Sequence, residues 1–474
     1  MKKINKITVI LSFIIIGFSS CTSWTEIKPE GLLLEDEAVT SGQDVVRIVN
    51  STYDALANRL NGTAQIYNDL LGDELANFNI NGDRKEMYTR GVIPFNSSSN
   101  DNFKGIYRCV FRANTCLDYI QKFDNDTIFN KSILEGEIKF IRALSHFEIA
   151  KLYAHPKGSS PLVDANGAQL GIPIRKVVTI DPVLRSTING TYDAIAADLI
   201  EAIALLPIAH PLNSVKKAHA DKNSAKALLA KVYFQSNQYQ KAIDVLNDLL
   251  SNTSLQLSDS LNHFDNKSFN KEYLFQFVST GTGDNRASGY TGNYRSDNVA
   301  IPNMQISSLA YNYMIQDTSD KRLGLIKIIN RGKPDEVYGS AKFNYDFFDV
   351  PYLLLTDMYL MRAEALAITN QNLSTAASDV NKIINRSYRN ASAKLLSGSE
   401  LADVIKFRVR EERRREFLLE GDRIQTFKRI GANGEIQTPN TMRNAAFNCN
   451  GLLFSYPQTE VTIGFSQNPL QTCN

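Results

Sequence analysis

Apolar residues recur every three or four positions along most of this chain, which is the spacing of helices that bury one face. In Gln43–Leu60, for example, Val45, Val49, Tyr53 and Leu56 would share one side of a helix. The same spacing predicts helices over Asn102–Ile120, Leu134–Tyr153, Thr187–Leu206, Asn223–Phe234, Tyr239–Leu250, Met358–Ala365, Ala376–Ile384 and Leu401–Leu418, with a looser stretch over Asn68–Phe78. The pattern predicts a mainly α fold.

Two of these regions have the pattern of a helical hairpin. In Asn223–Leu250 and again in Tyr352–Ile384, small residues alternate with Leu and Tyr at helical spacing across a short turn. Small residues let two antiparallel helices approach, as in tetratricopeptide repeats. We therefore expect a scaffold of divergent tetratricopeptide-like helix pairs within one domain covering residues 41–474.

Helical spacing fades in three places. Residues 79–101 are polar and contain Asn-Gly and Pro, so they predict a long surface loop. In the region 253–345, Tyr273–Val278 indicates a short strand, and a loop rich in glycine and aromatic residues follows it. After Gly421, which is expected to cap a helix in the left-handed conformation, the chain predicts an irregular tail.

Charges of both signs interrupt the apolar face of the helix that ends near Gly421. In Phe407–Arg423 the face runs from Val409 onto Glu412, Arg413 and Glu416. This pattern favours either a buried ion-pair network or a solvated charged helix. Glu137 and Arg142, on another apolar helix, are candidate partners for such a network. Because acidic residues alternate with the arginines, no positive stripe forms and nucleic acid is not an expected partner.

The N-terminus has the pattern of a targeting signal. Three lysines precede an apolar run, Ile7–Phe18, which is too short to span a membrane comfortably. Ser19-Ser20-Cys21 resembles a lipobox, so residues 1–20 are interpreted as a signal peptide and Cys21 as the lipidated first residue. A secretory signal with a chance cysteine is the alternative. Residues 21–40 then form a tether to the membrane.

Composition adds a few limits. With 43% hydrophobic residues, 22% charged residues and a net charge of +2, the chain is globular and carries no global charge for an anionic partner. Cys109 and Cys116 are expected to be buried thiols, whereas Cys449 and Cys473 could pair. The five histidines are scattered, so no metal site and no cofactor is expected. No catalytic motif is found, so we expect no catalytic residues.

Several motifs resemble the SusD-like (SusD/RagB) family of outer-membrane nutrient-binding lipoproteins. The strongest is Arg410-Glu-Glu-Arg-Arg-Arg-Glu-Phe-Leu-Leu-Glu-Gly-Asp-Arg423. Gly136–Tyr153, Phe103–Asn114, with Phe103 in place of the common Trp, and Met358–Ala365 also follow family patterns. The resemblance implies a helical scaffold with embedded variable loops. It also implies a non-enzymatic receptor at the cell surface, held in the outer membrane by lipid, that captures oligosaccharides for a SusC-like TonB-dependent transporter.

Two polar, aromatic loops are the expected ligand site, because sugars stack on aromatic rings and donate to polar side chains. The first covers about residues 77–103 and the second lies within 253–345, at 280–298. The candidate ligand residues are Phe78, Asn81, Asp83 and Tyr88 in the first loop, and Asp284, Arg286, Tyr290 and Tyr294 in the second.

Two alternatives stay open. A peptide-binding relative of the same family would use similar Tyr, Asn and Arg side chains. A surface lipoprotein glycosidase is a second alternative, although no pair of carboxylates is spaced to suggest acid–base catalysis.

Overall fold

The structure is a computed structural model, and it describes residues 39–76, 80–126, 128–158, 161–179, 181–213, 216–265, 272–297, 301–435, 441–462, 465–470 and 472–473. Helices dominate, as the sequence predicts. The signal peptide, Cys21 and the tether up to residue 38 lie outside the described residues. Among the residues described, no helix is long and apolar enough to cross a membrane.

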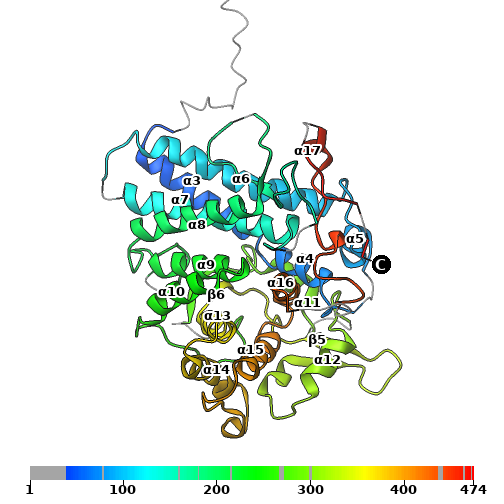
Figure 1. The fold of residues 1–474 in the computed structure, drawn as a ribbon. Coiled ribbons are helices and arrows are strands. Elements are labelled where there is room, and N and C mark those ends of the chain that lie inside the picture. Colours follow the sequence, from blue (N-terminus) through cyan, green and yellow to red (C-terminus); the bar gives the residue numbers. More distant parts are fainter. Residues whose placement is uncertain are drawn as a thin grey trace, which may run out of the picture.

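Antiparallel helices stack from one end of the molecule to the other (Figure 1). The upper layer and the two helices below it are α3 (Gly42–Ala57), α6 (Ser97–Ile120), α7 (Lys131–Tyr153), α8 (Ile188–Leu205), α9 (Lys222–Gln235) and α10 (Tyr239–Leu250). The lower end consists of α13 (Leu355–Ile368), α14 (Leu373–Ser387) and α15 (Ala402–Glu416). The hairpins α9–α10 and α13–α14 are the predicted tetratricopeptide-like pairs, and buried alanines such as Ala227 and Ala363 let their helices approach.

The remaining elements are short and lie mostly along one side of this stack (Figure 1). The helices are α4 (Thr63–Leu71), α5 (Gly82–Thr89), α11 (Ser288–Tyr294), α12 (Ser308–Ile315), α16 (Asp422–Ala432) and α17 (Gln458–Thr462). Three antiparallel two-stranded sheets pair β1 (Leu170–Pro173) with β2 (Arg185–Thr187), β3 (Tyr273–Phe277) with β6 (Val350–Leu354), and β4 (Ile326–Ile329) with β5 (Val337–Ser340). Short 3-10 helices cover Lys321–Leu325, Ala391–Lys394 and Asn450–Leu452.

The predicted loop over residues 79–101 is wrong for most of its length. α5 occupies Gly82–Thr89, and α6 begins at Ser97 rather than Asn102. Met87 is the only buried residue of α5, so this helix has no apolar stripe to find in a sequence. Tertiary contacts hold it instead: Asp83 accepts hydrogen bonds from the backbone and the hydroxyl of Ser98 at 2.7 and 2.8 Å.

The irregular tail predicted after Gly421 is also wrong at its start. Gly421 adopts the expected left-handed conformation (φ 75°), but α15 already ends at Glu416, and Gly421 precedes α16. A side chain at Gly421 would meet the backbone of Gln65 at 3.0 Å, so the position needs glycine for space as well as for φ. α16 buries Lys428 and Arg429, which hides its helical pattern.

The charged face of α15 is a buried ion-pair network, so the solvated alternative is wrong. Arg322 donates to Glu412 at 2.7 Å and to Glu416 at 2.8 Å, and these side chains are at most 2% exposed. Arg386 of α14 also pairs with Glu416, and His263 lies 3.0 Å from the same carboxylate. The network therefore joins α15 to α14 and to the 253–345 region.

Glu137 and Arg142 are not part of this network, contrary to the sequence prediction. Glu137 contacts His210 and His219, and Arg142 forms a bidentate pair with Asp198 at 2.8 and 2.7 Å. Both residues are buried on α7, where their nearest charges belong to the neighbouring α8 and the segment after it.

The structure confirms the two buried thiols predicted from the sequence and shows that the other two cysteines of the described residues are paired. Cys109 and Cys116 are free and buried on α6. Cys449 and Cys473 form a disulfide, which fastens the C-terminal segment to the chain 24 residues earlier.

Replacing Arg413 by Ala should destabilise the fold by about 3–5 kcal/mol, because it strands buried carboxylates. Arg413 donates to Asp357 at 2.8 Å and to Asp422 at 2.9 Å. Chemical denaturation of the wild type and of Arg413→Ala measures the difference in unfolding free energy, and calorimetry measures the accompanying fall in Tm. Arg47→Ala, which removes an exposed pair with Asp44, serves as the control and should leave the Tm close to that of the wild type. A wild-type Tm in Arg413→Ala would show that the ion pairs of Arg413 with Asp357 and Asp422 do not stabilise the fold.

Acid should unfold the protein steeply below about pH 4.5. Burial acts to raise the pKa of both Asp357 and Glu416. At Asp357, contacts with Lys231 and Arg413 outweigh burial and lower the pKa below 3.8. At Glu416, the contact with Arg386 contributes to lowering the pKa below 4.5. Carboxyls with depressed pKa values contribute stability above their unfolded pKa and lose it as the pH falls through the folded one.

Several buried groups affect the stability above pH 4.5 with opposite signs, and His146 and Glu74 represent the two directions. Burial lowers the pKa of His146 to about 3, so stability is lost as the unfolded chain takes up protons below pH 6.5. Burial raises the pKa of Glu74 to about 7, so stability is gained as the pH falls from 7 to 4.5. We expect a shallow Tm profile between pH 7 and 5 and a fall of at least about 5 °C between pH 5 and 3. A flat calorimetric profile down to pH 3 would contradict this account.

Candidate functional site

Three of the four predicted ligand residues of the first loop, Asn81, Asp83 and Tyr88, lie on or beside α5. Asn81 is exposed, whereas Asp83 is engaged by Ser98. The ring of Tyr88 is half-buried, and the guanidinium of Arg443 lies 4.0 Å from its centre. Phe78 lies outside the described residues. A ligand role for Asn81 and Tyr88 stays a prediction.

The second predicted loop reaches the first through Arg84, which donates to Asn293 of α11 at 2.7 Å. Asp284 and Arg286 pair with each other. Arg286 also binds Asp54 at 2.5 Å and Asn58 at 3.1 Å, which ties the loop to the end of α3. The two loops are thus brought together, but their charged groups are already partnered.

Tyr290 and Tyr294 are core residues, which corrects their expected place on a surface loop. They are 2% and 0% exposed and lie on α11. Tyr290 stacks on Phe343 with ring centres 4.5 Å apart, and the hydroxyl of Tyr294 donates to Asp69 at 2.7 Å. Neither ring offers a face to a ligand in this conformation, and truncating either would open a cavity.

A groove of about 390 Å³ lies on the outer face of α6, between this helix, the end of β1 and α17. It combines aromatic rings with charged side chains, as a sugar site requires. Its lining residues are Phe103, Lys104, Tyr107, Arg108, Phe111, Pro173, Arg175 and Glu460.

The aromatic wall of this groove is fixed in place. Phe111 is 51% exposed, so its ring is open to a ligand. The hydroxyl of Tyr107 donates to the carbonyl of Pro173 at 2.7 Å, and the ring packs against buried Phe103 with centres 4.6 Å apart. A wall held in this way loses little conformational entropy on binding.

Buried Arg142 holds the two sides of the groove together. It donates to Asn114 of α6 at 2.8 Å and to the carbonyl of Lys176 at 3.2 Å. Asn114 in turn donates to the carbonyl of Arg175 at 3.2 Å, and His146 accepts from the Arg175 backbone at 3.3 Å. Because burial lowers the pKa of His146 to about 3, its ring stays neutral and can accept that hydrogen bond.

The cations of the groove are free, unlike those of a second groove of about 250 Å³ on α15 and α16. In the second groove Arg410 pairs with Glu364, Arg413 with Asp357, and Arg423 with Asp73. Within the described residues, Lys104, Arg108 and Arg175 form no ion pair with a carboxylate. The groove on α6 can therefore offer its charges to a ligand.

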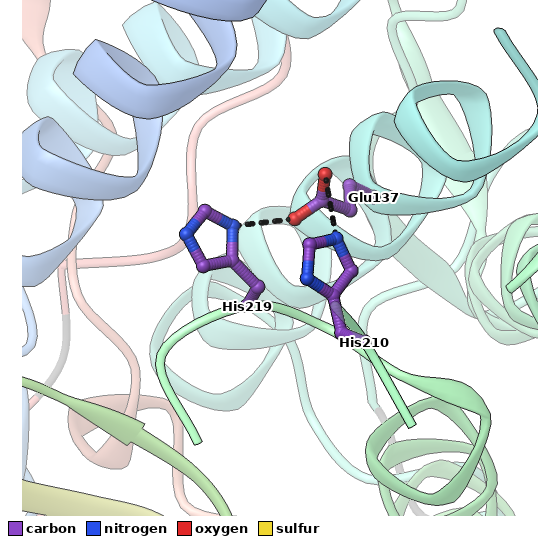
Figure 2. A group of neighbouring side chains, drawn as sticks. All are labelled: Glu137, His210 and His219. Carbon is purple, nitrogen blue, oxygen red and sulfur yellow. Dashed lines mark hydrogen bonds and ion pairs between the residues drawn. The ribbon is translucent and has the colours of Figure 1, made fainter. Parts of the chain in front are cut away.

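One cluster brings together the residue types that bind metals, although the sequence did not suggest it. Glu137 of α7 meets His210 and His219, with one ligand atom of each within 4.8 Å of the others (Figure 2). Nδ1 of His219 lies 2.8 Å from the carboxylate, and Nε2 of His210 lies 3.6 Å from its other oxygen. Burial acts to raise the pKa of Glu137, but the contacts with both histidines outweigh it and lower that pKa.

The hydrogen bonds of this cluster do not match those of a metal site. A metal-bound histidine donates from its remote nitrogen. Nδ1 of His210 instead accepts from the backbone of Leu212 at 3.2 Å, which leaves the proton on Nε2, the nitrogen that faces Glu137. The cluster therefore fits a clamp that holds the segment after α8 against α7 through one hydrogen bond, from His219, and one longer contact, from His210.

Part of the groove on α6 is visible in the sequence, although the ligand site was expected in the two loops. Lys104, Arg108 and Phe111 recur at intervals of four and three, which places them on one face of a helix. Arg175 and Glu460 come from distant segments, and no spacing in the sequence relates them to α6.

Comparison with known proteins gives the family. A profile described as starch-binding associating with outer membrane matches residues 24–234, and the SusD family profile matches residues 233–464. SusD-like protein P2 of Formosa agariphila is 24% identical over 93% of both chains, and SusD-like protein P25 of the same organism is 25% identical over 58% of this chain and 51% of its own.

Solved structures share the fold at low identity. A SusD superfamily protein of Bacteroides vulgatus superposes with a TM-score of 0.75 at 20% identity, covering 91% of this chain and 99% of the other. A laminarin-binding SusD-like protein superposes with a TM-score of 0.65 at 19% identity, covering 91% and 100%. Together the two profiles span nearly the whole chain outside the signal peptide, and the chain belongs to the SusD-like family.

Proposed function

We propose that this protein is a cell-surface lipoprotein that captures an oligosaccharide in the groove on α6 and delivers it to a SusC-like TonB-dependent transporter. The half-exposed ring of Phe111 beside unpaired polar groups is the observation that carries the proposal. One of the two family profiles matched by this chain is described as starch-binding associating with outer membrane, and one structural neighbour is laminarin-binding. These likenesses support a glycan over other ligands.

The mechanism needs no chemistry on the sugar. A sugar ring would stack its C–H face on Phe111, and its hydroxyls would bond to Glu460, Arg108 and Arg175. Such open contacts give modest affinity, which suits a receptor that must release its cargo to a transporter. A catalytic role is disfavoured because neither the sequence motifs nor the groove, with its single carboxylate Glu460, supplies an acid–base pair.

Phe111→Ala should weaken glycan binding about tenfold or more, because it removes the stacking platform. The assay is a retardation gel of the protein starting after Cys21, run through a panel of polysaccharides, with calorimetry for affinity. Phe407→Ala is the matched control, since Phe407 is a 65% exposed ring in the groove on α15 and α16. Equal affinity of Phe111→Ala and wild type would remove this groove from the site.

The same panel separates the alternatives. Calorimetric binding of oligopeptides, with no binding of any glycan, would favour a peptide-binding protein and contradict the glycan proposal. Release of reducing sugar from a retained polysaccharide would show a glycosidase.

The membrane anchor is proposed on the sequence alone. Cys21→Ala should abolish incorporation of labelled palmitate and release the protein from the outer membrane, because diacylation of that thiol would provide the anchor. Protease treatment of intact cells tests the expected surface exposure. Palmitate labelling that persists in Cys21→Ala would contradict the lipobox.

A further inference from the structure

The groove on α6 carries a local excess of positive charge. Three of its lining residues are cations, Lys104, Arg108 and Arg175, and one is an acid, Glu460, so the groove has a net charge of +2. The whole chain, with 52 basic and 50 acidic residues, also sums to only +2. The excess in the groove is therefore a local feature and not a reflection of an overall basic protein.

These cations are also positioned to act together. Lys104 and Arg108 are one turn apart on α6, and Phe111 follows on the same face. Arg175 faces them from the segment after β1, whose backbone is pinned by Asn114 and His146. Its guanidinium makes one long contact, 3.5 Å to the carbonyl of Thr179, and is otherwise open to a ligand.

We propose that the groove selects an acidic saccharide, whose carboxylate or sulfate ester is bound by Arg108 and Arg175 with help from Lys104. The inference rests on the proposed glycan-binding function and names the class of glycan. Guanidinium groups bind planar carboxylates and sulfate oxygens through paired hydrogen bonds, and two of them flank this groove. The sugar ring that carries the anion would stack on Phe111.

Charge complementarity would determine which saccharide is preferred. Stacking on Phe111 would contribute affinity for charged and neutral saccharides alike. Ion pairs open to solvent add little energy each and weaken with salt. They discriminate well because a neutral sugar gains nothing from them, and removal of water from unpaired cations costs affinity.

The test compares matched ligands that differ only in charge, using the protein that starts after Cys21. One pair is polygalacturonate and its methyl ester, and the other is a sulfated galactan and its desulfated form. The charged member of at least one pair should bind about tenfold more tightly, and raising NaCl from about 50 to about 300 mM should weaken it several-fold. The first pair reports on uronates and the second on sulfate esters.

Variants separate the anion contacts from general affinity. Arg108→Gln and Lys104→Gln, both at exposed positions, should weaken binding of the charged ligand more than binding of the neutral one, and so remove most of the preference and most of the salt dependence. Lys333→Gln is the control, because Lys333 is an exposed cation on the turn between β4 and β5. Phe111→Ala should weaken charged and neutral ligands alike.

The outcomes distinguish this inference from the function on which it rests. Equal affinity for the charged and neutral members of both pairs, with glycan binding intact, would overturn the acidic preference alone. An equal effect of Lys333→Gln and Arg108→Gln would also overturn it, by showing non-specific attraction. Failure to bind any glycan would overturn the proposed function, and the acidic preference with it.

Discussion

The buried charges around α15 are the constraint on which the rest of the structure depends. The side chains of Glu412 and Glu416 are at most 1% exposed, and Arg322 and Arg386 supply the opposite charges that pair with them. Arg322 lies 94 residues before Glu416 in the chain, so the network can form only after the 253–345 region has docked on the helical stack. Removing one partner leaves a charge without compensation in a dry interior, which is far more costly than losing a surface pair.

The pairing of charges also determines which groups on the surface remain free to bind a ligand. In the groove on α15 and α16, the arginines form ion pairs with Glu364, Asp357 and Asp73. In the 280–298 segment, Arg286 forms ion pairs with Asp284 and with the end of α3. The rings of Tyr290 and Tyr294 are also unavailable to a ligand, because they fill the core beside Phe343. Of these three regions of the described structure, the groove on α6 is the one that keeps free cations and an exposed aromatic ring, Phe111, for a ligand.

The groove depends on buried polar groups behind it. Arg142 is bonded to Asp198 of α8 and at the same time to Asn114 of α6 and the Lys176 carbonyl. A single buried guanidinium therefore relates three segments and sets the distance between the two walls of the groove. Glu137, one turn away on α7, performs a similar task for the segment carrying His210 and His219. The stretch Gly136–Tyr153 on α7 thus contains two residues that position neighbouring segments.

The sequence by itself determined the helical scaffold, the two hairpins, the Tyr273–Val278 strand, the buried thiols and the family, because helical spacing and consecutive motif residues are local properties of a chain. It also restricted α15 to two interpretations. Only the tertiary structure decided between them, since burial of Glu412 depends on Arg322, far away in the sequence. α5 was missed because Met87 is its only buried residue, and α16 because polar side chains on its buried face, such as Lys428, hide the apolar spacing. The groove required the tertiary structure for the same reason: Lys104, Arg108 and Phe111 share a helical face, but Arg175 and Glu460 meet them only through packing.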